Sequence, residues 1–256
     1  MLYSLSRETE YNMDNLKNSE HIEYIDGSLK LIVSDSHTFG TDALLLAAFC
    51  SPKRKNKVCD FGTGCGIIPF YWLREGVERV HAAEIQPLAC DQVKRSIELN
   101  SIADRFTLYD CDLRELKGKT EEGTFDLVSM NPPYTAEGHG IISSSSADKI
   151  ARHETNLTLG ELFTAGARLL KYGGRMCICL RPERLTEAMM EMRAAKLEPK
   201  RLRLVSQRDG KAPWLFLLEG KKGRNPGLII EKELHIENPD GTPSEEMLAI
   251  IGQYKK

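Results

Sequence analysis

From residue 57 onward, short apolar runs alternate with amphipathic segments along this chain. Five runs have strand character and stand at residues 57–61, 80–85, 105–109, 125–130 and 174–180. Strands that alternate with helices build a parallel sheet wrapped by helices. Two further runs, at 201–206 and 213–219, flank an Asp-Gly pair and favour a hairpin at the sheet's edge. The sequence therefore predicts an α/β, Rossmann-like fold whose seven-stranded, mostly parallel sheet ends in an antiparallel hairpin.

The first 55 residues follow a different pattern. The segment HIEYIDGSLKLIV consists of two short alternating runs around Asp26-Gly27, which predicts a β-hairpin. The apolar run ALLLAAF then predicts a helix, with Thr41 or Asp42 placed to cap its first amides. We expect residues 1–55 to form an extension of a main domain over residues 56–256. The order of the first 20 residues and the fold of the tail beyond residue 220 stay open.

Composition and charge narrow the possible classes. No run approaches the ~18 apolar residues that a membrane span requires, so we expect no membrane association. Seven scattered cysteines without a CxxC pair are typical of a reducing, cytoplasmic compartment. The net charge of -2 does not indicate a polyanionic partner, but residues 168–224 hold 15 Lys and Arg against 6 Asp and Glu. From charge alone, that stretch is either an ordinary solvated surface or a nucleic-acid contact.

A glycine-rich loop follows the first of the five strands. Gly62, Gly64 and Gly66 lie between a strand and a helix, where the backbone can approach a ligand and the helix N-terminus offers free amides. A dinucleotide loop would have its third glycine at position 67, which is Ile67 here. Asp60 ends the preceding strand and is placed either beside a cationic group of the ligand or against the loop's backbone amides.

Acidic residues close the next two strands. Glu84 ends the second strand, where a carboxylate can accept hydrogen bonds from both hydroxyls of a ribose. Asp110 and Asp112 follow the third strand, and the phasing favours Asp112 as the contact to an adenine amino group, with Asp110 as the alternative. Acidic walls attract a cationic sulfonium and release a neutral product. The G-x-G-x-G spacing of the loop resembles motif I of class I methyltransferases, and this resemblance implies a site for S-adenosyl-L-methionine.

The tetrad Asn131-Pro132-Pro133-Tyr134 stands at the carboxyl end of the fourth strand, where doubly wound sheets bind ligands. The two prolines end the strand in a stiff, extended turn. The Asn131 side-chain oxygen and the Pro132 carbonyl can both accept hydrogen bonds from one NH2 group, and Tyr134 can stack on a flipped base. The tetrad therefore predicts methyl transfer to a planar amino or amide nitrogen, with Asn131 in contact with both the acceptor and the cofactor.

The chain resembles the class I amino-methyltransferases that carry (N/D/S)-P-P-(Y/F/W). More narrowly, it resembles the bacterial family that methylates N6 of adenosine 37 in a valine tRNA. The narrower resemblance rests on three segments, which are HTFGTDA from residue 37, CDFGTGCG from residue 59 and ARHE from residue 151. It implies a tRNA partner, an N-terminal extension that covers the cofactor site, and Phe39, Thr41 and Asp42 at the methionine end of the cofactor.

Candidate RNA contacts lie after the tetrad. The loop over residues 135–156 is long for a structureless connection, which favours a substrate lid. Within it, Arg152 is a candidate phosphate contact and His153 a candidate for stacking or hydrogen bonding. Arg181 belongs to the basic stretch that can track a tRNA backbone, together with Arg184, Arg201 and Arg203.

Other functions stay open at this point. A protein glutamine N5-methyltransferase or a ribosomal RNA guanine N2-methyltransferase fits the same acceptor chemistry, but those families usually carry a larger helical N-terminal domain or a duplicated domain. An NAD-dependent oxidoreductase would leave the tetrad unexplained, and an idle RNA-binding domain would not bind the cofactor. Cys177 and Cys179 alone are half a metal site, so the sequence predicts no metal. It does not decide between a monomer and a weak dimer.

Overall fold

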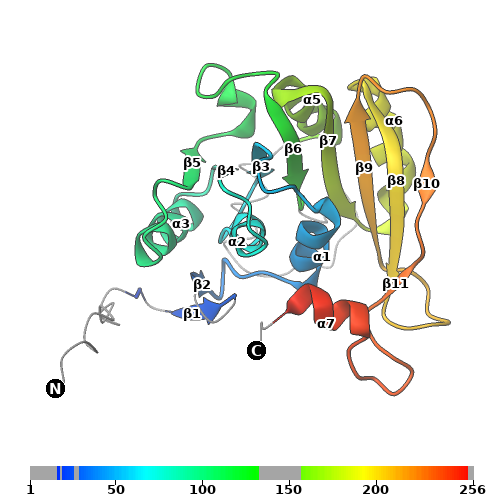
Figure 1. Cartoon of the computed structure of the whole chain (residues 1–256), viewed down its shortest axis with the longest axis horizontal. Helices are drawn as coiled ribbons and strands as arrows, with labels where there is room; N and C mark the ends of the chain where they lie inside the picture. The colour runs from blue at the N-terminus through cyan, green and yellow to red at the C-terminus, as the bar shows by residue number, and fades with distance from the viewer. Residues whose placement is uncertain (1–15, 18, 26–28, 133–156, 253–256) are drawn as a thin grey trace.

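A single nine-stranded sheet forms the middle of the molecule (Figure 1). The computed structural model describes residues 16–17, 19–25, 29–132 and 157–252. The strands of this sheet are β3 (Val58–Phe61), β4 (Val80–Glu84), β5 (Phe106–Asp110), β6 (Phe125–Met130), β7 (Leu170–Leu180), β8 (Leu197–Ser206), β9 (Leu215–Lys222), β10 (Ile229–Ile230) and β11 (Leu234–His235). Their order is β10-β8-β9-β7-β6-β3-β4-β5, and β11 also pairs with β8.

The pairing confirms the predicted fold class. Strands β3, β4, β5, β6 and β7 are parallel, whereas β9 runs antiparallel between β7 and β8. All seven predicted strands are present, including the terminal hairpin formed by β8 and β9. The sheet has two more strands than predicted, because β10 and β11 add parallel pairs beside β8 from the tail that the sequence left open.

Helices cover both faces of the sheet (Figure 1). They are α1 (Thr41–Cys50), α2 (Ile67–Arg74), α3 (Pro87–Leu99), α5 (Leu159–Leu169), α6 (Leu185–Ala194) and α7 (Glu245–Ile251), with the 3-10 turns η2 (Leu113–Leu116) and η3 (Pro182–Arg184). One core cluster joins α1, α2, α3 and α7 to one face, and Trp72 is fully buried in it. A second cluster joins η2, α5 and α6 to the other face around Phe163.

The predicted N-terminal hairpin is present as β1 (Glu20–Tyr24) and β2 (Lys30–Ser34). It packs on α3, where the Ile32 amide donates to Ser96 Oγ at 2.9 Å and Arg95 Nη1 donates to Glu20 Oε2 at 2.8 Å. Leu31 and Val33 belong to the same core cluster as α1 and α2. The hairpin and α1 thus share a core with the main domain, and a boundary near residue 55 stays a prediction.

The start of α1 corrects one expectation. Neither Thr41 nor Asp42 caps the helix, because the N-cap residue is Gly40 and no side chain bonds the first amides there. Asp42 is the second residue of α1, and its carboxylate accepts a hydrogen bond from Asn131, which is 89 residues later in the sequence. The side chain expected to cap the helix therefore contacts the tetrad instead.

Within the described residues, no helix is long and apolar enough to cross a membrane. In the same part of the chain, no group of three or more His, Cys, Asp or Glu side chains is arranged to hold a metal ion. All seven cysteines are buried and free of disulfides.

Candidate functional site

A cavity lies where the strand order changes direction. From β3 the chain adds β4 and β5 on one side, then returns to place β6 and β7 on the other side. Open α/β sheets bind ligands at the carboxyl ends of strands beside such a switch point. The cavity has a volume of about 240 Å³ and is lined by Gly62, Gly64, Ala83, Glu84, Ile85, Gln86, Cys111, Asp112, Leu113, Arg114, Met130, Asn131 and Leu157.

The three loop glycines have different surroundings. All three have positive φ angles, 59° at Gly62, 56° at Gly64 and 93° at Gly66, which only glycine adopts readily. A Cβ at Gly64 would meet no atom within 4 Å, so the backbone there borders open space. A Cβ at Gly66 would lie 3.3 Å from Val93 Cγ2. Gly64 therefore leaves room for a ligand, whereas Gly66 lies close to Val93 of α3 and does not line the cavity.

Glu84 holds the loop from the end of β4. Its Oε2 accepts the Gly64 amide at 2.8 Å, and its Oε1 accepts the amides of Ile85 and Gln86 at 2.9 and 2.8 Å. The side chain is 4% exposed and lines the cavity. Each carboxylate oxygen has two acceptor directions, so Oε2 can accept the Gly64 amide and a ligand hydroxyl together.

The two acidic residues after β5 are in different places. Asp112 lines the cavity and caps η2, and the Arg114 guanidinium beside it lowers the pKa of its carboxyl group. Asp110 does not line the cavity, and its carboxylate pairs with Lys94 Nζ at 2.7 Å. Of the two residues, Asp112 is therefore the one placed to contact a ligand in the cavity, and it is also the one that the phasing of the sequence favours over Asp110.

Asp60 is buried at the end of β3 and does not line the cavity. Ser129 Oγ of the neighbouring β6 donates to its Oδ1. Burial raises the pKa of Asp60 to about 7, and the negative charge of Glu84 adds to this rise while the Ser129 hydrogen bond opposes it. Asp60 thus changes its charge near neutral pH beneath the glycine loop.

The raised pKa of Asp60 predicts a pH-dependent loss of stability. Between about pH 4 and about pH 7 the folded protein binds more protons at Asp60 than the unfolded chain, so this residue makes folding less favourable as the pH rises. Asp60→Asn does not ionise. Its free energy of unfolding should rise relative to the wild type across this window, by about 1.4 kcal/mol per pKa unit. Urea unfolding at about pH 5 and about pH 8 measures the difference.

Comparison with the wild type is needed because His81 titrates in the same window. Burial lowers the pKa of His81 to about 4, so its contribution to stability grows as the pH rises, opposite in sign to that of Asp60. His81 is present in both proteins and its contribution cancels in the difference. If the difference in free energy of unfolding between Asp60→Asn and the wild type stays the same at both pH values, Asp60 does not have a raised pKa.

Asn131 follows β6 and lines the cavity. Its Nδ2 donates to Asp42 Oδ2 at 2.9 Å, and its Oδ1 accepts the thiol of Cys179 at a Sγ to Oδ1 distance of 3.1 Å. Pro132 follows as a buried residue. Pro133, Tyr134, Arg152 and His153 lie outside the described residues, as does the loop over residues 135–156.

The segment before α1 lies beside the site without lining the cavity. Phe39 packs against the core cluster that contains α1, and Thr41 is exposed at the first position of the helix. His37 Nε2 lies 2.8 Å from Oε1 of Gln86, a residue of the cavity wall. The structure therefore brings five of the predicted cofactor residues into the cavity wall, Gly62, Gly64, Glu84, Asp112 and Asn131, and places the others outside it.

The sequence did not single out several residues of the site. Arg114 lines the cavity and pairs with Asp112, and Gln86 follows Glu84 by two residues, so proximity to an acidic strand end could have pointed to both. Cys179 was predicted to be a core residue, and it is fully buried. Its contact with Asn131 depends on β7 lying next to β6, which no local pattern reveals.

Ion pairs within the protein engage much of the basic stretch. Arg184 pairs with Glu187, Arg201 with Glu219 and Glu231, and Arg203 with Glu246. Arg181 is exposed directly after β7, at the same edge of the sheet as Asn131.

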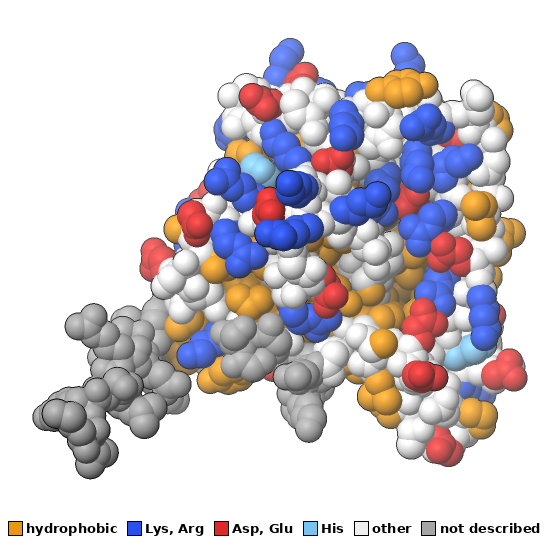
Figure 2. All heavy atoms as spheres, viewed as in Figure 1, with side chains coloured by type: hydrophobic (Ala, Val, Ile, Leu, Met, Phe, Trp, Pro, Cys, Tyr) orange, Lys and Arg blue, Asp and Glu red, His pale blue; other side chains and the backbone are white. Residues whose placement is uncertain are grey.

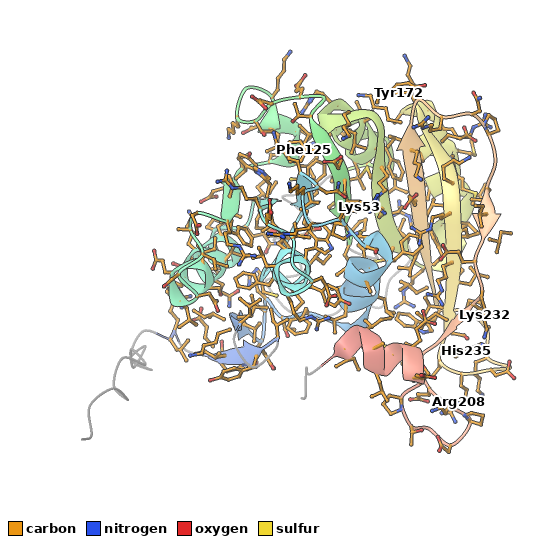
Figure 3. The ribbon with its side chains drawn as sticks, in the orientation of Figure 1. Lys53, Phe125, Tyr172, Arg208, Lys232 and His235 are labelled. Carbon is orange, nitrogen blue, oxygen red and sulfur yellow. The ribbon has the colours of Figure 1, made fainter. Side chains whose placement is uncertain are left out.

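In the view of Figure 2, Lys and Arg side chains gather over the upper and central part of the visible face. Figure 3 labels three residues of this part of the molecule, Lys53 before β3 and Phe125 and Tyr172 near the starts of β6 and β7, whereas Asn131 follows the end of β6. Of the four arginines considered from the sequence, Arg181 is the one that directly follows β7, the neighbour of β6, at the edge of the sheet where Asn131 lies.

Solved structures share this architecture. A predicted O-methyltransferase from Agrobacterium tumefaciens superposes with a TM-score of 0.68 at 18% identity, over 83% of this chain and 96% of that chain. TYW2 from P. horikoshii superposes with a TM-score of 0.55 at 16% identity, over 80% and 72% of the two chains. The fold is that of the class I methyltransferases.

The model of the methyltransferase small domain family matches residues 34–199. The chain belongs to this family. Curated relatives named tRNA1(Val) (adenine(37)-N6)-methyltransferase are similar over most of their length. The one from Parabacteroides distasonis is 28% identical over 221 residues, 84% of this chain and 89% of the relative. The one from Cronobacter sakazakii is 29% identical over 206 residues, 78% and 81% of the two chains. These similarities confirm the resemblance seen in the sequence.

Proposed function

We propose that this protein transfers the methyl group of S-adenosyl-L-methionine to N6 of an adenine in tRNA, at position 37 of a valine tRNA. One observation carries the proposal. The Asn131 carboxamide lines the same cavity as the glycine loop and Glu84, so an acceptor amine at Asn131 would lie beside a nucleoside cofactor held by the loop. The names of the relatives from Parabacteroides distasonis and Cronobacter sakazakii support tRNA as the substrate.

The residues of the cavity fit such a cofactor. Gly64 borders open space, Glu84 Oε2 can accept a ribose hydroxyl, and Asp112 can accept the adenine amino group. S-adenosylmethionine supplies an electrophilic methyl group on a positively charged sulfur. Acidic side chains around the cavity favour that cation over the neutral product. Phe39, Thr41 and Asp42 are proposed to lie toward its methionine end.

Asn131 and Pro132 would orient the acceptor. Asn131 Oδ1 and the Pro132 carbonyl oxygen accept one hydrogen bond each from the two protons of the N6 amine, which turns the nitrogen lone pair toward the methyl group. The nitrogen gains positive charge as its bond to the methyl group forms and the sulfur–methyl bond breaks, and the two oxygens stabilise that charge until one proton leaves the nitrogen for solvent, so no strong base is required. Positioning for in-line attack contributes further. Tyr134 would stack on the flipped adenine beside Pro133.

Contacts to the rest of the tRNA are proposed at the same edge of the sheet. Arg181 is exposed after β7 and can bind a backbone phosphate near the acceptor site. Arg152 would bind a second phosphate, and His153 would stack on or hydrogen bond to the anticodon loop. Because tRNA is a cytoplasmic substrate, we propose that the protein acts in the cytoplasm.

Methylation of a defined tRNA tests the proposal. The full-length protein, incubated with methyl-labelled cofactor and an unmodified valine tRNA transcript, is expected to yield labelled N6-methyladenosine on nucleoside digestion. A matched transcript with guanosine at position 37 should remain unlabelled, because guanine presents no N6 amine there. Chromatography of the digested nucleosides identifies the product.

Other products would assign another acceptor. Label confined to an added protein fraction would favour the glutamine N5-methyltransferase alternative, and N2-methylguanosine from ribosomal RNA would favour the guanine alternative. Absence of any cofactor binding in a calorimetric titration would leave the idle RNA-binding domain. Each of these results would overturn the proposed tRNA activity.

A further inference from the structure

We infer that Asp42 and Cys179 are positioning residues, which fix the orientation of the Asn131 carboxamide from its two ends. The inference rests on the proposed function, in which Asn131 Oδ1 accepts the amine to be methylated. Asp42 lies in the first turn of α1 and Cys179 near the end of β7, so the two contacts come from different elements. Both act on the methyl acceptor through Asn131.

The contact with Asp42 decides whether the nitrogen or the oxygen of the Asn131 side chain points toward Asp42. An ionised carboxylate only accepts hydrogen bonds. With Asp42 Oδ2 at 2.9 Å, the Asn131 side chain must present its NH2 group there and direct its oxygen away. The reverse orientation would place two acceptor oxygens against each other. Asp42 therefore ensures that the other end of the Asn131 side chain, which is proposed to accept the amine, carries the oxygen.

Gly40 makes room for this arrangement. A Cβ at position 40 would lie 2.5 Å from Asp42 Oδ1, so any side chain there would displace the carboxylate. Gly40 is the N-cap residue of α1, and no side chain caps the helix there. The Gly-Thr-Asp segment thus serves the contact between Asp42 and Asn131 rather than the helix end.

Cys179 holds the other end of the carboxamide. Met130 and Ile178 are register partners in the parallel pairing of β6 with β7, so the next residues, Asn131 and Cys179, are neighbours. The Cys179 thiol is fully buried and donates to Asn131 Oδ1 at 3.1 Å. An amide oxygen has two lone pairs, so this bond is compatible with a second one to the substrate amine.

The negative charge of Asp42 also has a chemical effect. A carboxylate that accepts from the NH2 end of an amide draws positive charge toward that end and leaves the oxygen more negative, because linked hydrogen bonds polarise one another. A more negative Oδ1 stabilises the positive charge that develops on the acceptor nitrogen. This stabilisation is greatest in the transition state, so we expect it to raise kcat rather than the affinity for the cofactor.

Three variants and one control test the inference in the full-length protein. Asp42→Asn and Cys179→Ala each remove one contact, whereas Cys179→Ser keeps a donor. Cys177→Ala is the control, because Cys177 is equally buried on the same face of β7 but its thiol lies 3.9 Å from Glu219 Oε2. The rate of tRNA methylation and the calorimetric Kd for S-adenosylmethionine are measured for each.

The expected pattern separates positioning from other roles. Asp42→Asn should lower kcat about 10- to 100-fold, as for partners that orient metal ligands, with a smaller change in Kd, because Asp42 is also proposed to lie toward the methionine end of the cofactor. Cys179→Ala should lower kcat less, Cys179→Ser should restore most of it, and Cys177→Ala should match the wild type. A weaker cofactor Kd in Asp42→Asn with unchanged kcat would overturn the inference, since Asp42 would then act on the cofactor.

A second readout needs no substrate. The NH2 resonance of the Asn131 side chain is identified in a ¹⁵N NMR spectrum by its absence in Asn131→Ala. It should shift in Asp42→Asn and in Cys179→Ala but not in Cys177→Ala. If the wild type fails to methylate tRNA, the proposed function fails, and this spectrum still decides whether the two residues orient Asn131. An unshifted resonance in Asp42→Asn and Cys179→Ala would overturn the inference whatever the substrate.

Discussion

Asn131→Ala is expected to lower kcat for tRNA methylation by about 10²- to 10³-fold, the effect of removing one preorganised group that stabilises developing charge. Alanine leaves the Pro132 carbonyl as the single acceptor for the N6 amine, so the nitrogen lone pair is no longer held toward the methyl group. Asn131 occupies one position of the cavity wall, and the glycine loop and Glu84 stay in place. The Kd for S-adenosylmethionine should therefore change by less than about threefold.

Single-turnover rates with labelled cofactor and calorimetric titration separate the two effects. Asn56→Ala is a suitable control, because Asn56 lies in the connector before β3, where its Oδ1 accepts the Lys53 amide at the edge opposite the cavity. That variant should retain the wild-type rate. If Asn131→Ala keeps more than about a tenth of kcat, Asn131 is not the group that orients the acceptor.

Most of the fold was predictable because buried parallel strands consist of continuous apolar runs. The strand over residues 125–130 has the predicted bounds, since an exposed turn precedes it and the prolines of the tetrad follow it. β7 begins four residues earlier than predicted, at Leu170, because Leu170 pairs with Phe125 ahead of an irregularity, after which the regular pairing resumes at Arg175. β10 and β11 have two residues each and exist only through their pairing with β8.

The residues of the candidate site that lie at the ends of strands could be predicted from the sequence. Gly64, Glu84, Asp112 and Asn131 each follow or close a different parallel strand, and parallel strands end at the same edge of a sheet, so their proximity follows from the fold class alone. The contacts of Asn131 do not follow in this way. Asp42 precedes it by 89 residues and Cys179 follows it by 48, and only the seating of α1 and the adjacency of β6 and β7 bring them together.

Loss of cofactor binding is the expected result for Glu84→Ala. The Kd for S-adenosylmethionine should rise at least about 100-fold, which corresponds to about 2.7 kcal/mol. Two effects combine, because the variant removes the carboxylate proposed to accept the ribose hydroxyls and also releases the Gly64 amide that Oε2 holds at 2.8 Å. Hydrogen bonds to a charged group are each worth about 1.5–3 kcal/mol. Calorimetric titration with S-adenosylmethionine measures the change, and circular dichroism checks that the variant is folded.

The two acidic residues after β5 provide the matched comparison for Glu84→Ala. Asp110→Ala removes a carboxylate that pairs with Lys94 outside the cavity, so its Kd should equal that of the wild type. Asp112→Ala removes a carboxylate from the cavity wall and should weaken binding less than Glu84→Ala, because Asp112 bonds Arg114 and not the glycine loop. Equal losses in Asp110→Ala and Glu84→Ala would mean that acidic charge near the sheet edge, and not the cavity, binds the cofactor. A wild-type Kd in folded Glu84→Ala would remove the cavity from the proposed mechanism.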